Sequence, residues 1–251
     1  MHDIAPEIRV ASSLSPVELF VVLYYGKFIK INPKNPSDKN RTKCIISKGH
    51  GSLCMYPILA DLGFFKKEEL KLICSGRNFL GGIPDPIIPG YETINGSLGH
   101  GLGVASGIAL ANKLKNNKRN TYIVSGDGEL MEGSVWEAVM FAGHHELKNL
   151  IMLVDNNSIS MLDKTKNIID PLNLQQKFIE FGWYAITIKD GHNVEEIFRQ
   201  LKKINLIKSK KPKVLILNTL KGNRVPGLEN FHLSHVTAVK KELLKDLIDN
   251  E

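Results

Sequence analysis

Two short stretches, each an apolar run that stops abruptly at polar residues, constrain this chain most strongly. The first, at 122–133, passes from Tyr-Ile-Val-Ser into Gly-Asp-Gly, and the second, at 150–159, passes from Leu-Ile-Met-Leu-Val into Asp-Asn-Asn. Each run has the length and composition of a buried strand. Apolar residues recur at helical spacing between them, over 133–147. We therefore predict two parallel neighbouring strands joined by a helix, with the loops that follow both strands at the same edge of the sheet.

Strand and helix patterns alternate along the rest of the chain as well. Further strands are expected at 44–47, 184–188 and 213–217, and further helices at 15–25, 171–181 and 194–204. This alternation predicts an α/β fold, a doubly wound parallel sheet with helices on both faces. A chain of 251 residues can bury a substantial core as one domain. We expect that domain to span residues 1–251, with a loosely packed tail from about residue 237.

Two helices carry more specific signals. The helix at 15–25 opens with Ser-Pro-Val-Glu, which reads as a capping box at Ser15 with proline in the first helical position. The helix at 133–147 carries an apolar stripe made of Val135, Trp136, Val139 and Met140. Such a stripe fits core packing and a subunit interface equally well.

The polar residues at the two strand ends suit one particular chemistry. Asp127 offers a carboxylate between two glycines, where backbone can approach a ligand closely, and Asn157 offers an amide oxygen. These two groups are too few to enclose a metal, but they suit Mg²⁺ that takes its other oxygens from phosphates and water. Glycine amides and a following helix would face the phosphate. The same residues are also common in ordinary turns, so the pattern alone leaves that alternative open.

Gly-Asp-Gly followed by Asn-Asn, with a strand leading into each, resembles the thiamine-diphosphate binding motif. Four segments are similar to transketolases in particular, and they occur in the same order. They are Ser-Lys-Gly-His-Gly at 47–51, Asn-Gly-Ser-Leu-Gly-His-Gly at 95–101, Gly-Glu-Leu-Met-Glu-Gly-Ser-Val-Trp-Glu-Ala at 128–138 and Thr-Leu-Lys-Gly at 219–222.

The resemblance implies thiamine diphosphate and Mg²⁺ as cofactors and gives a role to each matching residue. Asp127 and Asn157 would bind the metal through side chains, and Ile159 through its backbone carbonyl. The implied cofactor contacts are His50, Gly96, Leu98, Gly126, Asp127, Gly128, Glu129, Asn157, Ile159 and His232. Glu132 would belong to an acidic network between paired cofactor sites. Among these residues, His50, Glu132 and His232 are the candidates for a direct part in catalysis.

The chain departs from the transketolase pattern at two histidines that contact cofactor or substrate. Arg9 stands where the family has the first, and Ile83 stands where the family has the histidine of Gly-His-Pro. A site built to hydrogen-bond hydroxyl groups discriminates sharply on those hydroxyls. We therefore expect an altered pocket for the donor or the acceptor.

The resemblance also implies a partner. In transketolases a second domain supplies the glutamate that activates the pyrimidine ring of the cofactor, and the 251 residues contain no counterpart of that domain. We expect a separate C-terminal-type transketolase subunit and a heteromer with two copies of each chain. The expected reaction transfers a two-carbon ketol unit from a ketose or ketose phosphate to an aldehyde.

Two other functions stay open at this point. One is the thiamine-binding α subunit of a two-chain 2-oxo-acid dehydrogenase or decarboxylase, although such a chain is not expected to carry the segments at 47–50 or 96–99. The other is a non-catalytic scaffold or regulatory subunit, which Arg9 and Ile83 favour and the intact Asp127 and Asn157 pair disfavours.

Charge and hydrophobicity exclude other classes of function. The net charge is +7, but the lysines stand on expected helix faces and loops without interleaved aromatic residues, so we expect no nucleic-acid partner. No apolar run approaches the length of a transmembrane helix and no signal segment opens the chain, so we expect no membrane partner and a cytoplasmic location.

Overall fold

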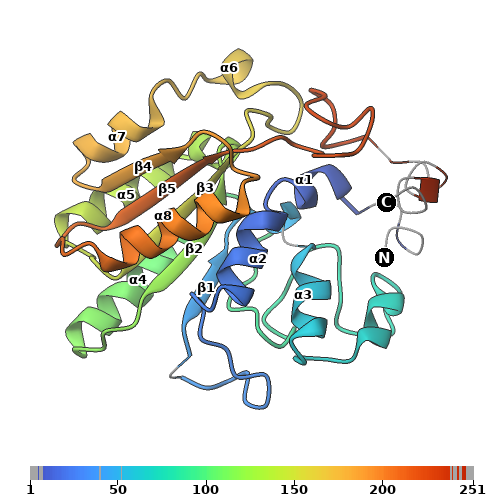
Figure 1. Ribbon diagram of the computed structural model, residues 1–251, viewed down its shortest axis with the longest axis horizontal. Coiled ribbons are helices and arrows are strands. Elements are labelled where there is room, and N and C mark those ends of the chain that lie inside the picture. Colours follow the sequence, from blue (N-terminus) through green and yellow to red (C-terminus); the bar gives the residue numbers. More distant parts are fainter. Residues whose placement is uncertain are drawn as a thin grey trace.

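Five parallel strands form one sheet, and their order confirms the doubly wound arrangement. The strands are β1 (Lys43–Ile46), β2 (Thr121–Gly126), β3 (Leu150–Asn156), β4 (Tyr184–Ile188) and β5 (Lys213–Asn218). Their order across the sheet is β1-β2-β3-β5-β4, and every neighbouring pair is parallel. All carboxyl ends therefore meet at one edge of the sheet, and all amino ends at the other (Figure 1).

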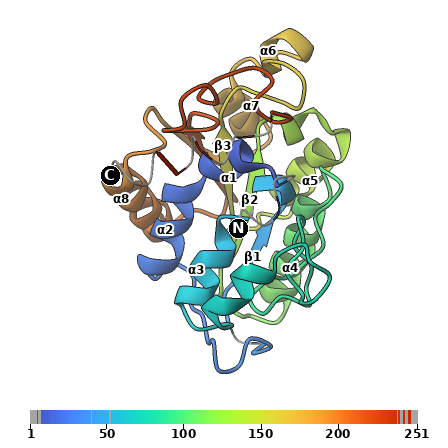
Figure 2. The ribbon, with the colours of Figure 1, turned by 90° about the vertical axis from the view of Figure 1, so that its right-hand side faces the viewer.

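Helices cover both faces of this sheet (Figure 2). On one face lie α2 (Val17–Tyr25), α3 (Met55–Asp61) and α8 (Val194–Leu206), and on the other lie α4 (Gly101–Leu114), α5 (Gly133–His144) and α7 (Leu174–Glu180). The shorter helices are α1 (Val10–Leu14), α6 (Thr165–Ile168) and the 3₁₀ turns η1 (Gly49–Gly51), η2 (Lys67–Leu72) and η3 (Gly128–Met131).

The apolar runs of the sequence explain why β2 and β3 occupy the centre. Along β3, Ile151 and Leu153 pack into the cluster beneath α2, α3 and α8, whereas Leu150, Met152 and Val154 pack into the cluster beneath α4, α5 and α7. All five are completely buried. A parallel strand that is buried on both faces needs a continuous apolar sequence, and this is the pattern that the chain carries.

The computed structural model describes residues 5, 8–39, 41–51, 53–237, 239, 242 and 245–246. Most of the tail expected to be loosely packed, from about residue 237, therefore lies outside the described residues. None of the helices within the described ranges is long and apolar enough to span a membrane.

The start of the chain differs from the sequence prediction. A short helix, α1, precedes α2, and α2 begins at Val17 without a side-chain cap. The predicted capping box at Ser15 is wrong, because the Ser15 hydroxyl donates to Asp155 Oδ2 at 2.6 Å. The Ser15 oxygen accepts from Lys48 Nζ at 3.0 Å, and not from a backbone N–H at the start of α2 as a helix cap would.

The apolar stripe on α5 belongs mainly to the core. Val135 and Val139 are buried, and the Trp136 ring packs against Phe178 and Phe181. Only Met140 of the four is largely exposed, at 48%. Within the described residues, the stripe as a whole is therefore not available as a subunit interface.

Gly143 lets α5 pack closely against the loop before β4, and its replacement tests this packing. A Cβ atom at this position would lie 2.0 Å from the carbonyl oxygen of Phe181, whereas a Cβ at Gly107 of α4 would meet nothing within 4 Å. We expect Gly143→Ala to lower the free energy of unfolding by about 1–3 kcal/mol. Gly107→Ala should raise it by about 0.5–1 kcal/mol, because alanine favours the helix. Urea unfolding of both variants checks this pair, and equal effects would contradict the packing described.

Candidate functional site

Four strand ends converge at the carboxyl edge of the sheet and bring polar residues together. Lys48 follows β1, Asp127 follows β2, Asp155 is the penultimate residue of β3 with Asn157 just beyond the strand, and Thr219 follows β5. These side chains lie far apart in the sequence and meet because the strands are parallel and neighbouring. None of these residues is more than 9% exposed.

An ion pair between Lys48 and Asp155 lies at the centre of this group. Lys48 Nζ donates to Asp155 Oδ2, and the two side chains are 11% and 1% exposed. Asp155 also accepts from Ser15 at 2.6 Å, from Thr219, and from Asn157 Nδ2 at 3.2 Å. Burial raises the pKa of Asp155, but Lys48 and the hydroxyl donors outweigh it and hold that pKa below its usual value. Asp155 therefore stays charged and joins four segments of the chain.

Asp127 is a second buried carboxylate, with different partners. Its oxygens accept from backbone N–H groups only in the described contacts, from Gly128 at 2.9 Å and Ser158 at 2.6 Å. Burial raises its pKa to about 7, the negative charge of Asp155 adds to this, and Lys48 partly opposes it. A buried carboxylate whose charge is not paired is suited to receive a cation.

A cavity opens beside Asp127. Its lining contains Ser12, Lys48, His50, Leu98, Gly126, Asp127, Gly128, Glu129, Asn157, Ile159, Ser160, Met161, Lys221 and His235. The structure thus brings together eight of the residues singled out in the sequence, namely His50, Leu98, Gly126, Asp127, Gly128, Glu129, Asn157 and Ile159.

The other side of the cavity is rich in cationic and imidazole groups. Burial first, and then neighbouring positive charges, lower the pKa of Lys221 to about 7 and that of His235 to about 3, although Asp127 and Asp155 partly oppose the shift of Lys221. The pKa of His50 is lowered as well, by burial first and then by Arg9, Lys221 and Lys48. The His50 and His235 rings lie edge to face, with centroids 5.3 Å apart, and His235 Nδ1 lies 2.9 Å from Ser12 Oγ. The positively charged forms of Lys221, His235 and His50 are therefore disfavoured in the free cavity, and a bound anion would favour them.

Glu129 lines the cavity and also holds its wall together. Its carboxylate accepts from Ser47 Oγ, from Ser125 Oγ at 2.7 Å and from the Gly99 N–H at 2.8 Å. Gly99 has a φ of +85°, and a Cβ there would lie 2.7 Å from Glu132 Cβ. The turn before α4 therefore requires glycine, and Glu129 fixes this turn against β1 and β2.

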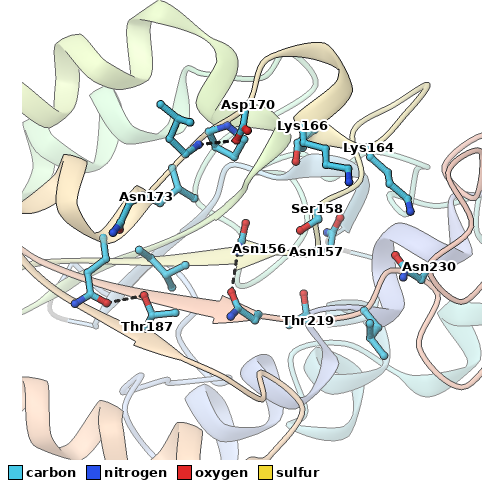
Figure 3. Close-up of a pocket in the computed structure, with 18 residues that line it drawn as sticks. Asn156, Asn157, Ser158, Lys164, Lys166, Asp170, Asn173, Thr187, Thr219 and Asn230 are labelled. Carbon is cyan, nitrogen blue, oxygen red and sulfur yellow. Dashed lines mark hydrogen bonds between the residues drawn. The ribbon is translucent and has the colours of Figure 1, made fainter.

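A second cavity adjoins the first at the same edge of the sheet, beyond Asn157 (Figure 3). Amide and hydroxyl groups line it, together with Lys164 and Lys166, and its volume is about 580 Å³. Asn156 Nδ2 donates to Asn218 Oδ1 at 2.8 Å across its floor. Asn157 contributes to both cavities, so the loop that carries it separates them.

Comparison with known proteins decides the family. The family described as "Transketolase, thiamine diphosphate binding domain" matches residues 11–249. The chain is also 36% identical, over 94% of its own length and 86% of the relative, to the 6-deoxy-6-sulfo-D-fructose transketolase subunit SqwG of Clostridium sp. (strain MSTE9). The chain belongs to the transketolase family. This confirms the resemblance and leaves the 2-oxo-acid dehydrogenase alternative without support.

Other transketolases extend the comparison. An apulose-4-phosphate transketolase subunit of Phocaeicola vulgatus is 31% identical over 90% of this chain and 80% of that protein. A crystal structure of transketolase from Campylobacter jejuni superimposes with a TM-score of 0.87 at 29% identity. It covers 99% of this chain, but the chain spans only 42% of that transketolase. The fold is thus that of one part of a longer transketolase and of nearly all of the subunit-type relatives.

Three residues expected at the site of this transketolase-family chain do not line the cavity. His232 is exposed, and its ring packs on Phe231 instead. Glu132 lies beside the Gly99 turn, and Gly96 lies in the loop next to Ile83. Their direct roles toward the cofactor remain predictions.

Six lining residues were not assigned a role from the sequence: Ser12, Lys48, Ser160, Met161, Lys221 and His235. For two of them a signal was present, because Lys48 and Lys221 each follow a strand of the parallel sheet and so reach the same edge as Asp127. The choice between His232 and His235 had no such signal. Both stand in an irregular loop, where no periodicity tells which side chain turns inward.

The metal-binding groups expected from the family are present but engaged within the chain. Asn157 Oδ1 accepts from the Ile159 N–H at 3.1 Å, and the Ile159 carbonyl accepts from Lys221 Nζ at 3.1 Å. Each oxygen keeps a second lone pair. In the part of the chain that the structure describes, no three His, Cys, Asp or Glu side chains group into a metal site of their own. This donor set fits Mg²⁺ that draws its other ligands from phosphate and water.

Arg9 and Ile83, the two departures from the transketolase histidines, lie near residues of the cavity without lining it. The charge of Arg9 acts on His50 and His235. The side chain of Ile83 lies 3.7 Å from the place that a Cβ of Gly49 would take, next to His50. Arg9 and Ile83 therefore change the charge and the polarity around the cavity.

The raised pKa of Asp127 predicts how the stability of the free chain depends on pH. Its unfolded pKa is about 3.9, so between about pH 4 and 7 only the folded chain holds this proton, and the stability from that proton is lost as pH rises through about 7. Relative to Asp127→Asn, the wild type should lose up to about 1.4 kcal/mol of unfolding free energy per pH unit in this window. Urea unfolding without ligands from pH 5 to 7 measures the difference. A difference that does not change with pH would refute the burial argument.

Proposed function

We propose that this chain binds Mg²⁺ and thiamine diphosphate in the cavity beside Asp127 and, together with a second subunit, transfers a two-carbon ketol unit between sugars. The observation that carries the proposal is the composition of the cavity. A buried carboxylate without a paired cation faces one part of it, and Lys48, Lys221 and two imidazoles face another. A metal-bound diphosphate would supply a cation to the carboxylate and an anion to the lysines and imidazoles.

The residues divide the task between them. Asp127, Asn157 and the Ile159 carbonyl would hold the metal, while His50, Lys221 and His235 would contact diphosphate oxygens. Gly128 follows Asp127 at the start of η3 and leaves the backbone close to the ligand. When bound, thiamine diphosphate supplies the carbanion chemistry, and the chain positions it and excludes water. Leu98, in the cavity lining, and Gly96 would lie against its pyrimidine.

Three observations support a partner subunit. Two relatives that the chain matches over 86% and 80% of their own length are named subunits. The cavity is only about 110 Å³, below the roughly 300–1,000 Å³ of pockets that enclose a ligand. The loop after Asn157 exposes Met161 at 54% and Leu162 at 59% beside it. A second chain would complete the cavity and cover this loop, and we propose a cytoplasmic assembly of two copies of each.

Co-purification with the product of the neighbouring open reading frame tests this function. We expect the two chains together, but not this chain alone, to carry out ketol transfer with Mg²⁺ and thiamine diphosphate. Asp127→Ala should abolish the cofactor-dependent thermal stabilisation of the complex, which is a few kcal/mol at saturating ligand. Asp170→Asn, at an exposed acid of the neighbouring cavity, serves as the matched control.

Two results would contradict the proposal in different ways. Ketol transfer by this chain alone would show that it contains a catalytic carboxylate of its own and needs no partner. A complex that forms but neither binds the cofactor nor reacts would instead identify a scaffold or regulatory subunit.

The substrate should differ from those of common transketolases. A guanidinium at Arg9 and an alkyl side chain at Ile83 replace two imidazoles around the cavity, so hydroxyl contacts are lost and a positive charge is gained. Arginine pairs readily with carboxylate or phosphate. By their names, two relatives act on 6-deoxy-6-sulfo-D-fructose and on apulose 4-phosphate.

We therefore expect the assembled enzyme to turn over xylulose 5-phosphate and ribose 5-phosphate poorly. Restoring the histidines with Arg9→His and Ile83→His should raise kcat/KM on these substrates by about tenfold or more, the equivalent of one good hydrogen bond or about 1.4 kcal/mol. Steady-state kinetics of the complex measures this. Wild-type turnover equal to that of a common transketolase would rule out the altered pocket.

A further inference from the structure

Lysines from three segments of the chain surround a cavity at the amino edge of the sheet, opposite the cofactor cavity. The segments lead into β2, β3 and β5, and the parallel strands bring them together. The cations in the lining are Lys113, Lys118, Lys148, Lys208, Lys210 and Lys213. The volume is about 780 Å³, and no carboxylate lines it among the residues that the structure describes. We call this cavity the basic cavity.

Two of these lysines are held in place by backbone rather than by acids. Lys213 Nζ donates to the Lys148 carbonyl at 2.9 Å, and Lys113 Nζ donates to the His145 carbonyl at 2.8 Å. Lys213 is only 5% exposed, and burial, together with Lys148, lowers its pKa. The lysines of the basic cavity therefore repel one another, and a bound anion would offset this repulsion.

One residue of the lining also has a buried acceptor without a partner. Asn149 lines the basic cavity and is 8% exposed. Its Nδ2 donates to the Ala109 carbonyl at 2.9 Å, but its Oδ1 has no hydrogen-bond partner. A buried amide oxygen without a donor is costly, so a ligand with a hydroxyl or amino group would satisfy it.

An adjoining cleft extends the same positive surface. It shares Asn117, Lys118 and Asn120 with the basic cavity and adds Lys27, Lys30 and Arg119. Ile207 and the alkyl parts of the lysines give the basic cavity an apolar wall as well. Cations, an unsatisfied acceptor and an apolar wall together suit an organic phosphate better than a simple inorganic ion.

We propose that the basic cavity binds a small organic polyphosphate of the nucleoside diphosphate class. The lysines would hold the phosphates, Asn149 Oδ1 would accept from a ring amino group or hydroxyl, and the lysine stems with Ile207 would contact the ring. This site is separate from the cofactor cavity, and the proposal does not depend on the ketol-transfer function.

Calorimetric titration of the full chain with ADP in EDTA tests the proposal, with pyrophosphate and adenosine as separate probes. We expect saturable ADP binding that weakens with salt, weaker binding of pyrophosphate, and no measurable binding of adenosine. The triple variant Lys118→Gln, Lys208→Gln, Lys210→Gln should weaken ADP binding at least tenfold. These three side chains are exposed, so the fold should tolerate the change.

Two controls make the test specific. The triple variant Lys66→Gln, Lys71→Gln, Lys202→Gln removes the same charge from exposed positions elsewhere and should bind ADP as the wild type does. A Lys221→Met chain, altered in the cofactor cavity, should do so too. The proposal is wrong if ADP does not bind, if both triple variants lose binding equally, or if Lys221→Met abolishes it. Binding of an RNA oligonucleotide without binding of ADP would also overturn it.

Discussion

The buried ion pair between Lys48 and Asp155 is the interaction on which the site depends. Asp155 lies near the end of β3 and Lys48 follows β1, so the pair links strand ends on either side of β2. The same carboxylate accepts from Ser15, from Thr219 after β5 and from Asn157. Removing one partner of such a pair typically costs about 3–5 kcal/mol, because a charge is then left buried and unpaired. The segments around the cavity are thereby fixed to one another rather than only packed together.

This arrangement also sets the electrostatics of Asp127. Asp155 keeps its negative charge because Lys48 pairs with it, so Asp127 is the carboxylate that resists ionisation. Their different neighbours thus shift the pKa values of these two buried acids in opposite directions. One is a permanent structural anion, and the other is open to a cation from outside.

The sequence predicted the fold well because a parallel sheet has a strong local signal. Runs such as 150–154 must be apolar on both faces, and the polar residues that follow them mark the edge where ligands bind. That logic correctly brought Asp127, Asn157 and His50 to one cavity. It did not find the partners of Asp155, because Ser15 looks like a helix cap and Lys48 like a surface lysine until their distant acceptor is known. Contacts between residues more than a hundred positions apart leave no trace in local periodicity.

The opposed titrations of Asp127 and Lys221 have a consequence for how the cavity takes up its ligand. Both groups have a pKa of about 7 in the free chain, so near neutral pH each is only partly charged. A bound cation favours loss of the proton from Asp127, and a bound anion favours gain of a proton by Lys221. Uptake of a metal-bound diphosphate would therefore pass a proton from one wall to the other, with little net exchange with solvent. Until then Asp127 and Lys221 are each only partly charged, and the ligand that matches them favours the charged form of both.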